Sequence, residues 1–330
     1  MAGLQMTKRI LKMGTRGSIL ARTQSGHVSM EVSELWGTPV EEVIIRAEGD
    51  DTTTPITSAT RPGIFVSSLR DALLDGEVDF IVHSFKDLPS APHPGITVAA
   101  VPLREDIRDV LVSKDGLALM DLPAGAVVGT SSPRRAARVL FARPDLIVKP
   151  IRGNIDSRIA KVRAGEYDAT VLAAAGLNRI GLSGEACEFL SLDLMLPAPA
   201  QGALAVECRS DDVELLEVLA KLNDPESRIV TTAERAVLVG VAASCATAIG
   251  AVAILENDQL TVTAELSDET TNEHERVSIS VPMVSDNYNG PHAVSEAYQT
   301  GLFVAAKLME TELGARLRGA GGATIGGNLA

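Results

Sequence analysis

Arginines recur in short segments of small and polar residues. Eight of the 30 basic residues are lysines and the rest are arginines. Arginine grips carboxylates and phosphates through paired hydrogen bonds, although a GC-rich genome would also favour arginine codons. Segments of this type join strands to helices, where free backbone N–H groups also bind anions, so they predict an anion site. The arginines in such segments are Arg16, Arg134, Arg135, Arg152 and Arg179.

Asp87 is the candidate carboxylate. It follows the apolar segment 78–84, within the sequence HSFKDLP. One interpretation is that its side chain caps the turn before Pro89. The other is that it binds N–H donors or a cation in a cleft, with Lys86 keeping it ionised. His83 is expected to be a structural polar group.

Cys245 is the best candidate for a nucleophile. It lies among small residues in GVAASCATAIG, and small neighbours leave a thiol accessible. Burial is the commoner fate of a free cysteine, so both interpretations stay open. Cys187 and Cys208 are expected to pack in a helix and a strand. No histidine lies near Cys245 in the sequence, which gives a Cys–His hydrolase no support.

Other kinds of site lack a signal. Neither a GxxxxGK[ST] phosphate loop nor a GxGxxG fingerprint is present. The sequence has no HExxH motif and only five scattered histidines, so we expect no metal site.

Charge and hydropathy restrict the partners and the location. A net charge of −13 argues against binding to nucleic acid or to an anionic membrane. The sequence has no run of about 18 uncharged apolar residues, so we expect no membrane span. No apolar segment follows the basic N-terminus, which predicts the absence of a signal peptide. The three widely spaced cysteines fit a reducing compartment, so we predict a cytoplasmic location.

Strands and helices alternate in the first part of the chain, which indicates a mainly parallel sheet covered by helices. The polar segment 49–63, with two prolines, predicts a mobile functional loop. The predicted strands are 9–15, 40–48, 78–84 and 96–103, and the predicted helices are 18–35 and 64–76.

The middle of the chain repeats this pattern. The proline-rich start of segment 196–209 predicts a hinge at which the chain returns to the first domain. The predicted strands are 109–113, 126–130, 146–153, 167–176 and the end of 196–209, and the predicted helices are 132–144 and 155–166.

The last part predicts a small α+β domain with an antiparallel sheet. The glycine-rich tail 319–330 is predicted to be disordered. The predicted helices are 212–222, 225–241 and 292–317, and the predicted strands are 248–256, 259–267 and 275–283.

Together these elements predict an α/β fold. It consists of two periplasmic-binding-protein-like α/β domains with mainly parallel sheets, and a small C-terminal α+β domain with an antiparallel three-stranded sheet. A charged ligand would lie in the crevice at the carboxyl ends of the strands. The predicted domains are 1–102 with 200–222, then 103–199, then 223–318, before the tail.

Many short motifs, in order, resemble one family, the porphobilinogen deaminases or hydroxymethylbilane synthases. Each motif alone is weak, but the ordered set is specific and covers roughly residues 9–318. The motifs are TRGS (15–18), HSFKDLP (83–89), REDIRD (104–109), GTSSPRR (129–135), RPDL (143–146), RGNIDSR (152–158), GEYDATVLAAAGLNRIGL (165–182), LPAPAQGALAVECR (196–209) and TAERA with SCATAIG (232–250).

The resemblance implies an enzyme of tetrapyrrole biosynthesis. Such an enzyme is a transferase that condenses four porphobilinogens into linear hydroxymethylbilane and releases one ammonia for each ring. It implies a dipyrromethane cofactor, held by a thioether at Cys245, and a catalytic Asp87 that accepts pyrrole N–H bonds. It also implies a monomer with a small-molecule substrate and no nucleic acid, membrane or metal.

The remaining site residues also follow from the resemblance. Every pyrrole ring carries an acetate and a propionate, so the growing chain needs many cations. The matching carboxylate-binding arginines are Arg16, Arg134, Arg135, Arg152, Arg158 and Arg179. The matching polar contacts are Ser18, Lys86, Thr130, Ser131 and Ser132, and the hinge residues are Gln201 and Gly202.

The sequence departs from the family pattern at several places. The segment SATRPG has Pro62 where a lysine is common, with Arg61 beside it. Around the cysteine, Ser244 replaces a glycine and Ala248 a proline. Gly17 replaces the common glutamine after Arg16. Two alternatives therefore stay open: a bilobal polycarboxylate-binding protein without catalysis, or a weakly active paralogue.

Overall fold

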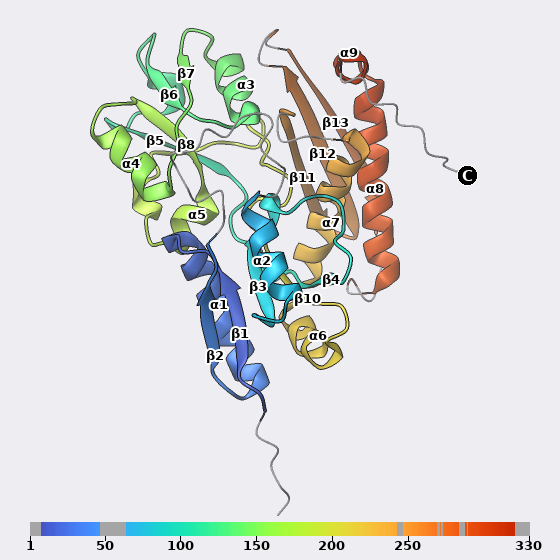
Figure 1. The fold of residues 1–330 in the computed structure, drawn as a ribbon. Helices are drawn as coiled ribbons and strands as arrows, with labels where there is room; N and C mark the ends of the chain where they lie inside the picture. Colours follow the sequence, from blue (N-terminus) through green and yellow to red (C-terminus); the bar gives the residue numbers. More distant parts are fainter. Residues whose placement is uncertain are drawn as a thin grey trace, which may run out of the picture.

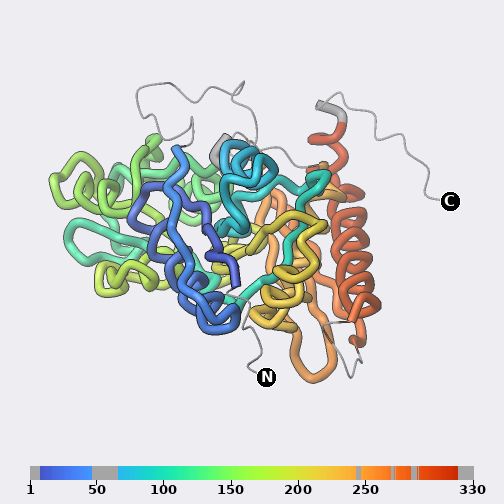
Figure 2. The backbone as a smooth tube through the Cα atoms, turned by 60° about the horizontal axis from the view of Figure 1, so that its bottom comes forward, coloured from blue at the N-terminus to red at the C-terminus, as the bar shows by residue number. Residues whose placement is uncertain are grey.

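The computed structural model describes residues 8–46, 64–242, 247–268, 271, 273–283, 288 and 290–320. Within these residues the chain forms three β-sheets, each covered by its own helices. Figures 1 and 2 show the last helices of the chain, at residues 291–320, on the outer side of the molecule, away from the first sheet. No helix in this part of the chain is long and apolar enough to cross a membrane.

Lobe 1 is the first sheet with its helices. Its strand order is β2-β1-β3-β10-β4. The strands are β1 (Leu11–Thr15), β2 (Val40–Ile44), β3 (Phe80–Ser84), β4 (Ile96–Ala100) and β10 (Leu204–Arg209). Helices α1 (Ile19–Trp36) and α6 (Val213–Leu219) cover one face, and α2 (Ile64–Leu74) covers the other. Because both faces are covered, β3 is apolar at successive positions.

Lobe 2 is the second sheet with its helices. Its strand order is β7-β6-β8-β5-β9. The strands are β5 (Asp109–Ser113), β6 (Val127–Gly129), β7 (Ile147–Lys149), β8 (Ala169–Ala173) and β9 (Glu188–Phe189). Helix α3 (Pro133–Ala142) covers one face, and α4 (Ile155–Arg163) and α5 (Ala174–Arg179) cover the other.

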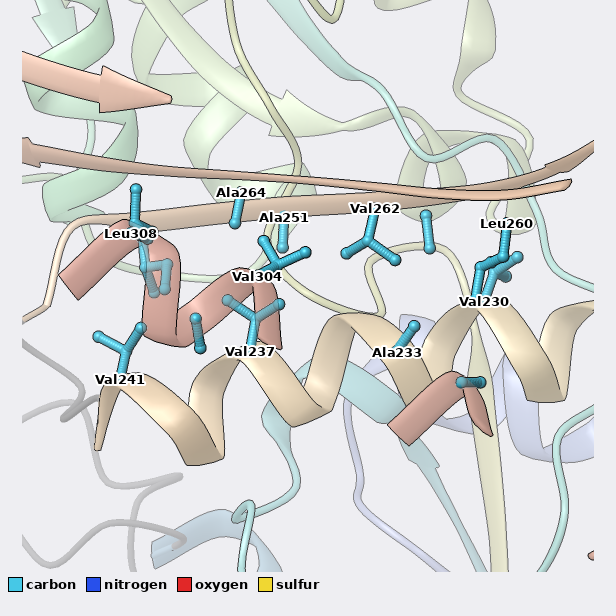
Figure 3. Packing of buried hydrophobic residues seen from close by; sticks show 14 of the residues in the cluster. Val230, Ala233, Val237, Val241, Ala251, Leu260, Val262, Ala264, Val304 and Leu308 are labelled. Carbon is cyan, nitrogen blue, oxygen red and sulfur yellow. The ribbon is translucent and has the colours of Figure 1, made fainter. Parts of the chain in front are cut away.

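The C-terminal unit is an antiparallel sheet with three helices. Its strands are β11 (Ile249–Glu256), β12 (Gln259–Asp268) and β13 (Glu273–Pro282). Its helices are α7 (Pro225–Val241), α8 (Pro291–Glu310) and α9 (Glu312–Ala320). Figure 3 shows the apolar face of α7, with Val230, Ala233 and Val237, packed towards the sheet residues Ala251 and Val262.

The predicted fold class is confirmed, with one antiparallel strand in each lobe. Strand β10 runs antiparallel to β3 and β4, and β5 runs antiparallel to β8 and β9. Each of these two strands follows a segment that crosses between the lobes, 101–108 before β5 and 196–203 before β10. The return of the chain to the first sheet, expected from the proline-rich segment, is therefore observed, while the domain limits stay a prediction.

Some predicted elements were wrong in extent. The predicted strand 167–176 ends at Ala173, where α5 begins. The predicted helix 292–317 is two helices, because the Thr311 hydroxyl accepts a hydrogen bond from Gly314 N and starts α9. Residues 319–320 belong to α9, while the loop 49–63 and residues 321–330 lie outside the described residues. Short 3₁₀ turns were not predicted: η2 (Phe85–Asp87), η3 (Leu119–Asp121), η4 (Ser183–Glu185) and η5 (Ala220–Leu222).

A buried ion pair joins the crossing segments to the C-terminal unit. The Arg104 guanidinium donates two 2.8 Å hydrogen bonds to the fully buried Glu234 carboxylate on α7. Glu234 also accepts from the backbone N–H groups of Ala200 and Ala253. One carboxylate therefore contacts both crossing segments and β11.

The crossing segments pass each other in close contact at Gly202. Its φ is +89°, and a Cβ there would lie 2.4 Å from the Glu105 carbonyl oxygen. Only glycine satisfies both constraints.

Helices α7 and α8 pack in close contact at Gly301. A Cβ at Gly301 would lie 2.1 Å from the Ala233 carbonyl oxygen. We expect Gly301→Ala to lower the free energy of unfolding by about 1–3 kcal/mol, because the helices must separate. Gly26→Ala is the matched control, since nothing lies within 4 Å of that Cβ and alanine favours the helix. Denaturant unfolding monitored by circular dichroism measures both, and equal stability of the two variants would contradict the prediction.

Candidate functional site

A cavity of about 220 Å³ lies between lobe 1 and lobe 2. Lobe 1 contributes the segment after β1 and the turn after β3, and the end of the crossing segment before β10 adds Gly202 and Ala203. Lobe 2 contributes the end of β8 and the N-terminal part of α4. The crevice at the carboxyl ends of the strands, expected from the order of the elements, is thus present. Its cationic lining residues are Arg16, Lys86, Arg135, Arg158 and Arg179, and Asp156 is the acidic one among the residues that line it.

The start of α1 presents Arg16 and Ser18 to this cavity. Ser18 caps the helix, because its hydroxyl accepts a 3.2 Å hydrogen bond from Ala21 N. The loop before the helix is held by a 2.8 Å hydrogen bond between the buried Thr15 and Ser25 hydroxyls. The N-terminus of this 18-residue helix lies at the cavity, and its partial positive charge favours an anion there.

Arg158 and Arg179 approach from lobe 2, each held by a backbone carbonyl. Arg158 Nε donates to Gly153 O at 2.8 Å, and Arg179 Nη2 donates to Gly202 O at 2.6 Å. Burial lowers the pKa of both guanidinium groups, with the Arg135 charge adding to the effect at Arg158. Neither forms an ion pair with a carboxylate within the described residues. Two desolvated cations of this type favour an anionic ligand.

Asp109 was not predicted as a site residue, and it binds two residues that were. This fully buried carboxylate receives hydrogen bonds from Arg134 at 2.7 Å and from Arg135 at 2.7 and 3.2 Å. Burial opposes its charged form, but the two guanidinium groups hold the pKa of Asp109 well below its usual range. An aspartate at the first position of the apolar segment DVLVS is the sequence signal that could have identified it.

Gln201 connects this cluster to Lys86 in lobe 1. Its amide nitrogen donates to Ile107 O and to Asp109, at 2.9 and 3.0 Å. Its amide oxygen accepts a 3.2 Å hydrogen bond from Lys86 Nζ. Burial and the Arg135 charge lower the pKa of Lys86 to about 8, against the opposing charges of Asp87 and Asp109. One side chain of the crossing segment therefore links the cationic groups of the two lobes.

Asp87 lies in η2 with an exposed side chain. It lines a second cavity of about 80 Å³, which shares Arg16, Ser18 and Ser84 with the first. His83 also lines this cavity and is buried, with Nε2 3.2 Å from the Glu207 carboxylate. The two cavities are neighbours, so a carboxylate lies beside the cationic cleft.

Several predicted site residues lie outside the lining of both cavities. Arg134 donates to Asp109 and to Leu196 O, while Thr130, Ser131 and Ser132 make local bonds in lobe 2. Ser132 caps α3, and Ser131 bonds the backbone of Ile151. Arg152 is exposed. Gln201 is buried beside the cleft, and Gly202 lines it.

Cys245 and Ser244 lie outside the described residues. The strand that follows them contacts a crossing segment, because Ala251 N donates to Pro197 O at 3.0 Å. Ala248 is buried. Cys208 is buried as predicted, and burial raises the pKa of its thiol to about 12. The prediction for Cys187 was wrong: it is exposed, because it lies in the bend before β9 rather than in a helix.

The described residues hold no group of three or more histidines, cysteines or acids that could bind a metal ion.

Comparisons with known proteins match this chain to one protein family. The family model described as "Porphobilinogen deaminase, dipyromethane cofactor binding domain" matches residues 11–217. "Porphobilinogen deaminase 1" of Streptomyces coelicolor is 52% identical over 261 residues, which cover 78% of this chain and 82% of that protein. "Porphobilinogen deaminase" of Mycolicibacterium paratuberculosis is 44% identical over 313 residues, with 93% and 96% covered. Among solved structures, a periplasmic binding protein of Salmonella typhimurium has a TM-score of 0.38 at 13% identity. The match covers 65% of this chain and 92% of that one.

The environment of Lys86 predicts an unusual titration. Its ammonium group is charged below about pH 8 and neutral above it, because burial disfavours the charged form. We expect the ¹⁵Nζ signal of Lys86 to titrate with a midpoint near pH 8, and the signal is assigned by its loss in Lys86→Arg. Added citrate should raise the midpoint, since a carboxylate favours the ammonium form. A midpoint above pH 10 would contradict the prediction.

Proposed function

Because the chain belongs to the porphobilinogen deaminase family, we propose that it is a hydroxymethylbilane synthase. It condenses four porphobilinogen molecules into linear hydroxymethylbilane in tetrapyrrole biosynthesis, with one ammonia released for each ring. The observation that carries this proposal is the cluster of cations from both lobes beside Asp87. The cytoplasmic location and the monomeric state implied by the resemblance belong to the same proposal.

The donor set of the cleft fits a dipyrromethane cofactor. Each pyrrole ring of such a group carries an acetate and a propionate, so two rings carry four carboxylates. The cleft offers arginines from four separate segments together with Lys86 and the N-terminus of α1. Guanidinium groups bind carboxylates through two parallel hydrogen bonds. The dipyrromethane, when bound, supplies the pyrrole carbon at which the chain is extended.

Arg16, Arg135, Arg158 and Arg179 would hold the carboxylates in this cleft. Arg158 and Arg179 are already oriented by backbone carbonyls, so little freedom is lost on binding. Arg134 has a different part in this proposal: it fixes Asp109, and through Asp109 the neighbouring Arg135. Lys86 adds a positive charge below about pH 8, where its ammonium group is protonated.

Asp87 would act on the pyrrole itself. Its exposed carboxylate can accept hydrogen bonds from pyrrole N–H groups in the smaller cavity. When ammonia leaves porphobilinogen, positive charge develops on the ring, and a fixed carboxylate offsets that charge. The same carboxylate can hold or release the proton that the leaving amine requires.

Cys245 would attach the cofactor. The strand after it lies against the crossing segment at Leu196 and Pro197, where a Cβ at Gly250 would also approach Arg134. Cys245 comes shortly before this strand in the sequence, and the crossing segment that the strand contacts contains Gly202, which lines the cleft.

Mass spectrometry tests the attachment. We expect the denatured protein to carry an excess mass of two substrate-derived pyrrole units, mapped to the peptide with Cys245. Cys245→Ser should lack this mass, because an alcohol is a poorer nucleophile than a thiol. An adduct on another residue would reject the assignment. Protein that stays unmodified and releases no ammonia after incubation with porphobilinogen would instead favour the non-catalytic binding protein.

Asp87→Asn tests the role of the carboxylate. We expect the rate of product formation to fall about 10²–10⁴-fold with a folded protein, since the amide can neither offset charge nor carry the proton. Asp75→Asn, at the exposed end of lobe 1 helix α2, is the matched control and should retain activity. Near-normal turnover in Asp87→Asn would remove this residue from the mechanism.

A further inference from the structure

Arg235 in the TAERA segment has no place in the mechanism above, although its side chain reaches the turn with Lys86 and Asp87. We propose that Arg235 is a positioning residue of the reaction, which holds η2 in place from helix α7 of the C-terminal unit. The inference rests on the proposed function, because it concerns the same carboxylate.

Three backbone carbonyls around η2 accept hydrogen bonds from this one guanidinium. Arg235 Nη1 donates to Phe85 O at 3.0 Å and to Leu88 O at 3.1 Å. Arg235 Nη2 donates to Pro89 O at 2.6 Å. The guanidinium carbon also lies 4.5 Å from the centre of the Phe85 ring. The carbonyls come from both sides of Lys86 and Asp87, so the side chain clamps the turn at its two ends.

The turn needs such donors because it is short and partly buried. Phe85 O accepts a 3.3 Å hydrogen bond from Leu88 N inside the turn, but Leu88 and Pro89 follow the turn, so their carbonyls need donors from elsewhere. Phe85 and Leu88 are 7% and 4% exposed, so water has little access there. A buried carbonyl without a donor lowers the stability of the fold. A cation near the C-terminal end of a helical turn also interacts favourably with the partial negative charge of the carbonyl groups there.

The charge of Arg235 serves the backbone and not the ligand. Burial lowers its pKa to about 10, with Glu207 opposing that effect, so the group stays protonated at neutral pH. It forms no ion pair with a carboxylate within the described residues, and it lines neither of the two cavities. Its donors are directed at carbonyl oxygens, which is the behaviour of a positioning group.

Neighbouring contacts tie η2 to the crossing segment. On its other side the turn is held by Phe85 N, which donates to Ala203 O at 3.0 Å. Glu234, the residue before Arg235, accepts from Ala200 N at 2.6 Å in the same crossing segment. Two adjacent residues of α7 thus fix the crossing segment and the turn relative to each other, and with them the position of Asp87 beside the cleft.

Steady-state kinetics on the holoenzyme tests the proposal. We expect Arg235→Gln to lower kcat about 100-fold with KM changed less than about threefold, because a displaced carboxylate acts poorly on the reacting ring. Arg235→Lys should recover part of the loss, since an ammonium group reaches fewer of the carbonyls. Arg228→Gln is the matched control: Arg228 is also on α7, is desolvated, and donates to Val98 O of lobe 1 at 3.0 Å, away from η2. It should retain kcat within about twofold.

Hydrogen exchange gives a readout independent of activity. The amides of the peptide 83–91 should exchange at least about tenfold faster in Arg235→Gln than in the wild type and in Arg228→Gln. Unchanged exchange, unchanged kcat, or an equal loss in Arg228→Gln would overturn the proposal. If Arg235→Gln does not fold, a roughly tenfold loss of kcat in Arg235→Lys takes its place as the test. An inactive wild type would refute the proposed function, while the exchange comparison would still decide the clamp.

Discussion

The buried carboxylate of Asp109 allows cations to gather between the lobes. Two like charges 4 Å apart repel by about 4 kcal/mol at an effective dielectric constant of 20, so adjacent arginines need a counter-charge. Asp109 supplies it to Arg134 and Arg135, and the Gln201 amide extends the cluster to Lys86. Removing one partner of a buried pair costs about 3–5 kcal/mol, because the other charge stays desolvated. The shape of the cleft therefore depends on this cluster.

The described residues of the C-terminal unit support the site although none of them lines the two cavities. Glu234 contacts both crossing segments and β11, and Arg235 contacts the turn that carries Asp87. Ala200, which Glu234 holds, has a φ of +63°, a conformation that costs energy for a residue with a side chain. The hydrogen bond from Ala200 N to this buried carboxylate stabilises that backbone conformation.

The protein is acidic overall, whereas its cleft is lined by cations. The net charge is −13, yet among the described residues that line the first cavity there are four arginines and a lysine against one acidic residue, Asp156. At physiological ionic strength the Debye length is about 8 Å, so distant surface carboxylates act weakly inside the cleft. Arginine suits this place better than lysine, because it stays charged when desolvated, whereas the pKa of Lys86 falls to about 8.

The sequence by itself determined the sheet-forming elements and the region of the site. Apolar runs and the positions of proline and glycine are local signals, so the order and type of the long elements followed from them. The same reasoning placed five arginines near one crevice, because segments after parallel strands share one edge of a sheet: Arg16, Arg134, Arg135, Arg152 and Arg179. Of these, Arg16, Arg135 and Arg179 line the cavity. The resemblance added Arg158, the ligand contact of Lys86, and the roles of Asp87 and Cys245.

Only the tertiary structure decided which of these residues face the cleft. Arg134 and Arg135 are neighbours in the sequence, yet one lines the cavity and the other does not. Their shared partner Asp109 lies 25 residues before Arg134, at the start of a strand that enters lobe 2 antiparallel to β8. Likewise Arg235 reaches Phe85 across 150 residues. Such pairs depend on how the sheets pack together, and local sequence signals carry no information about partners at that separation.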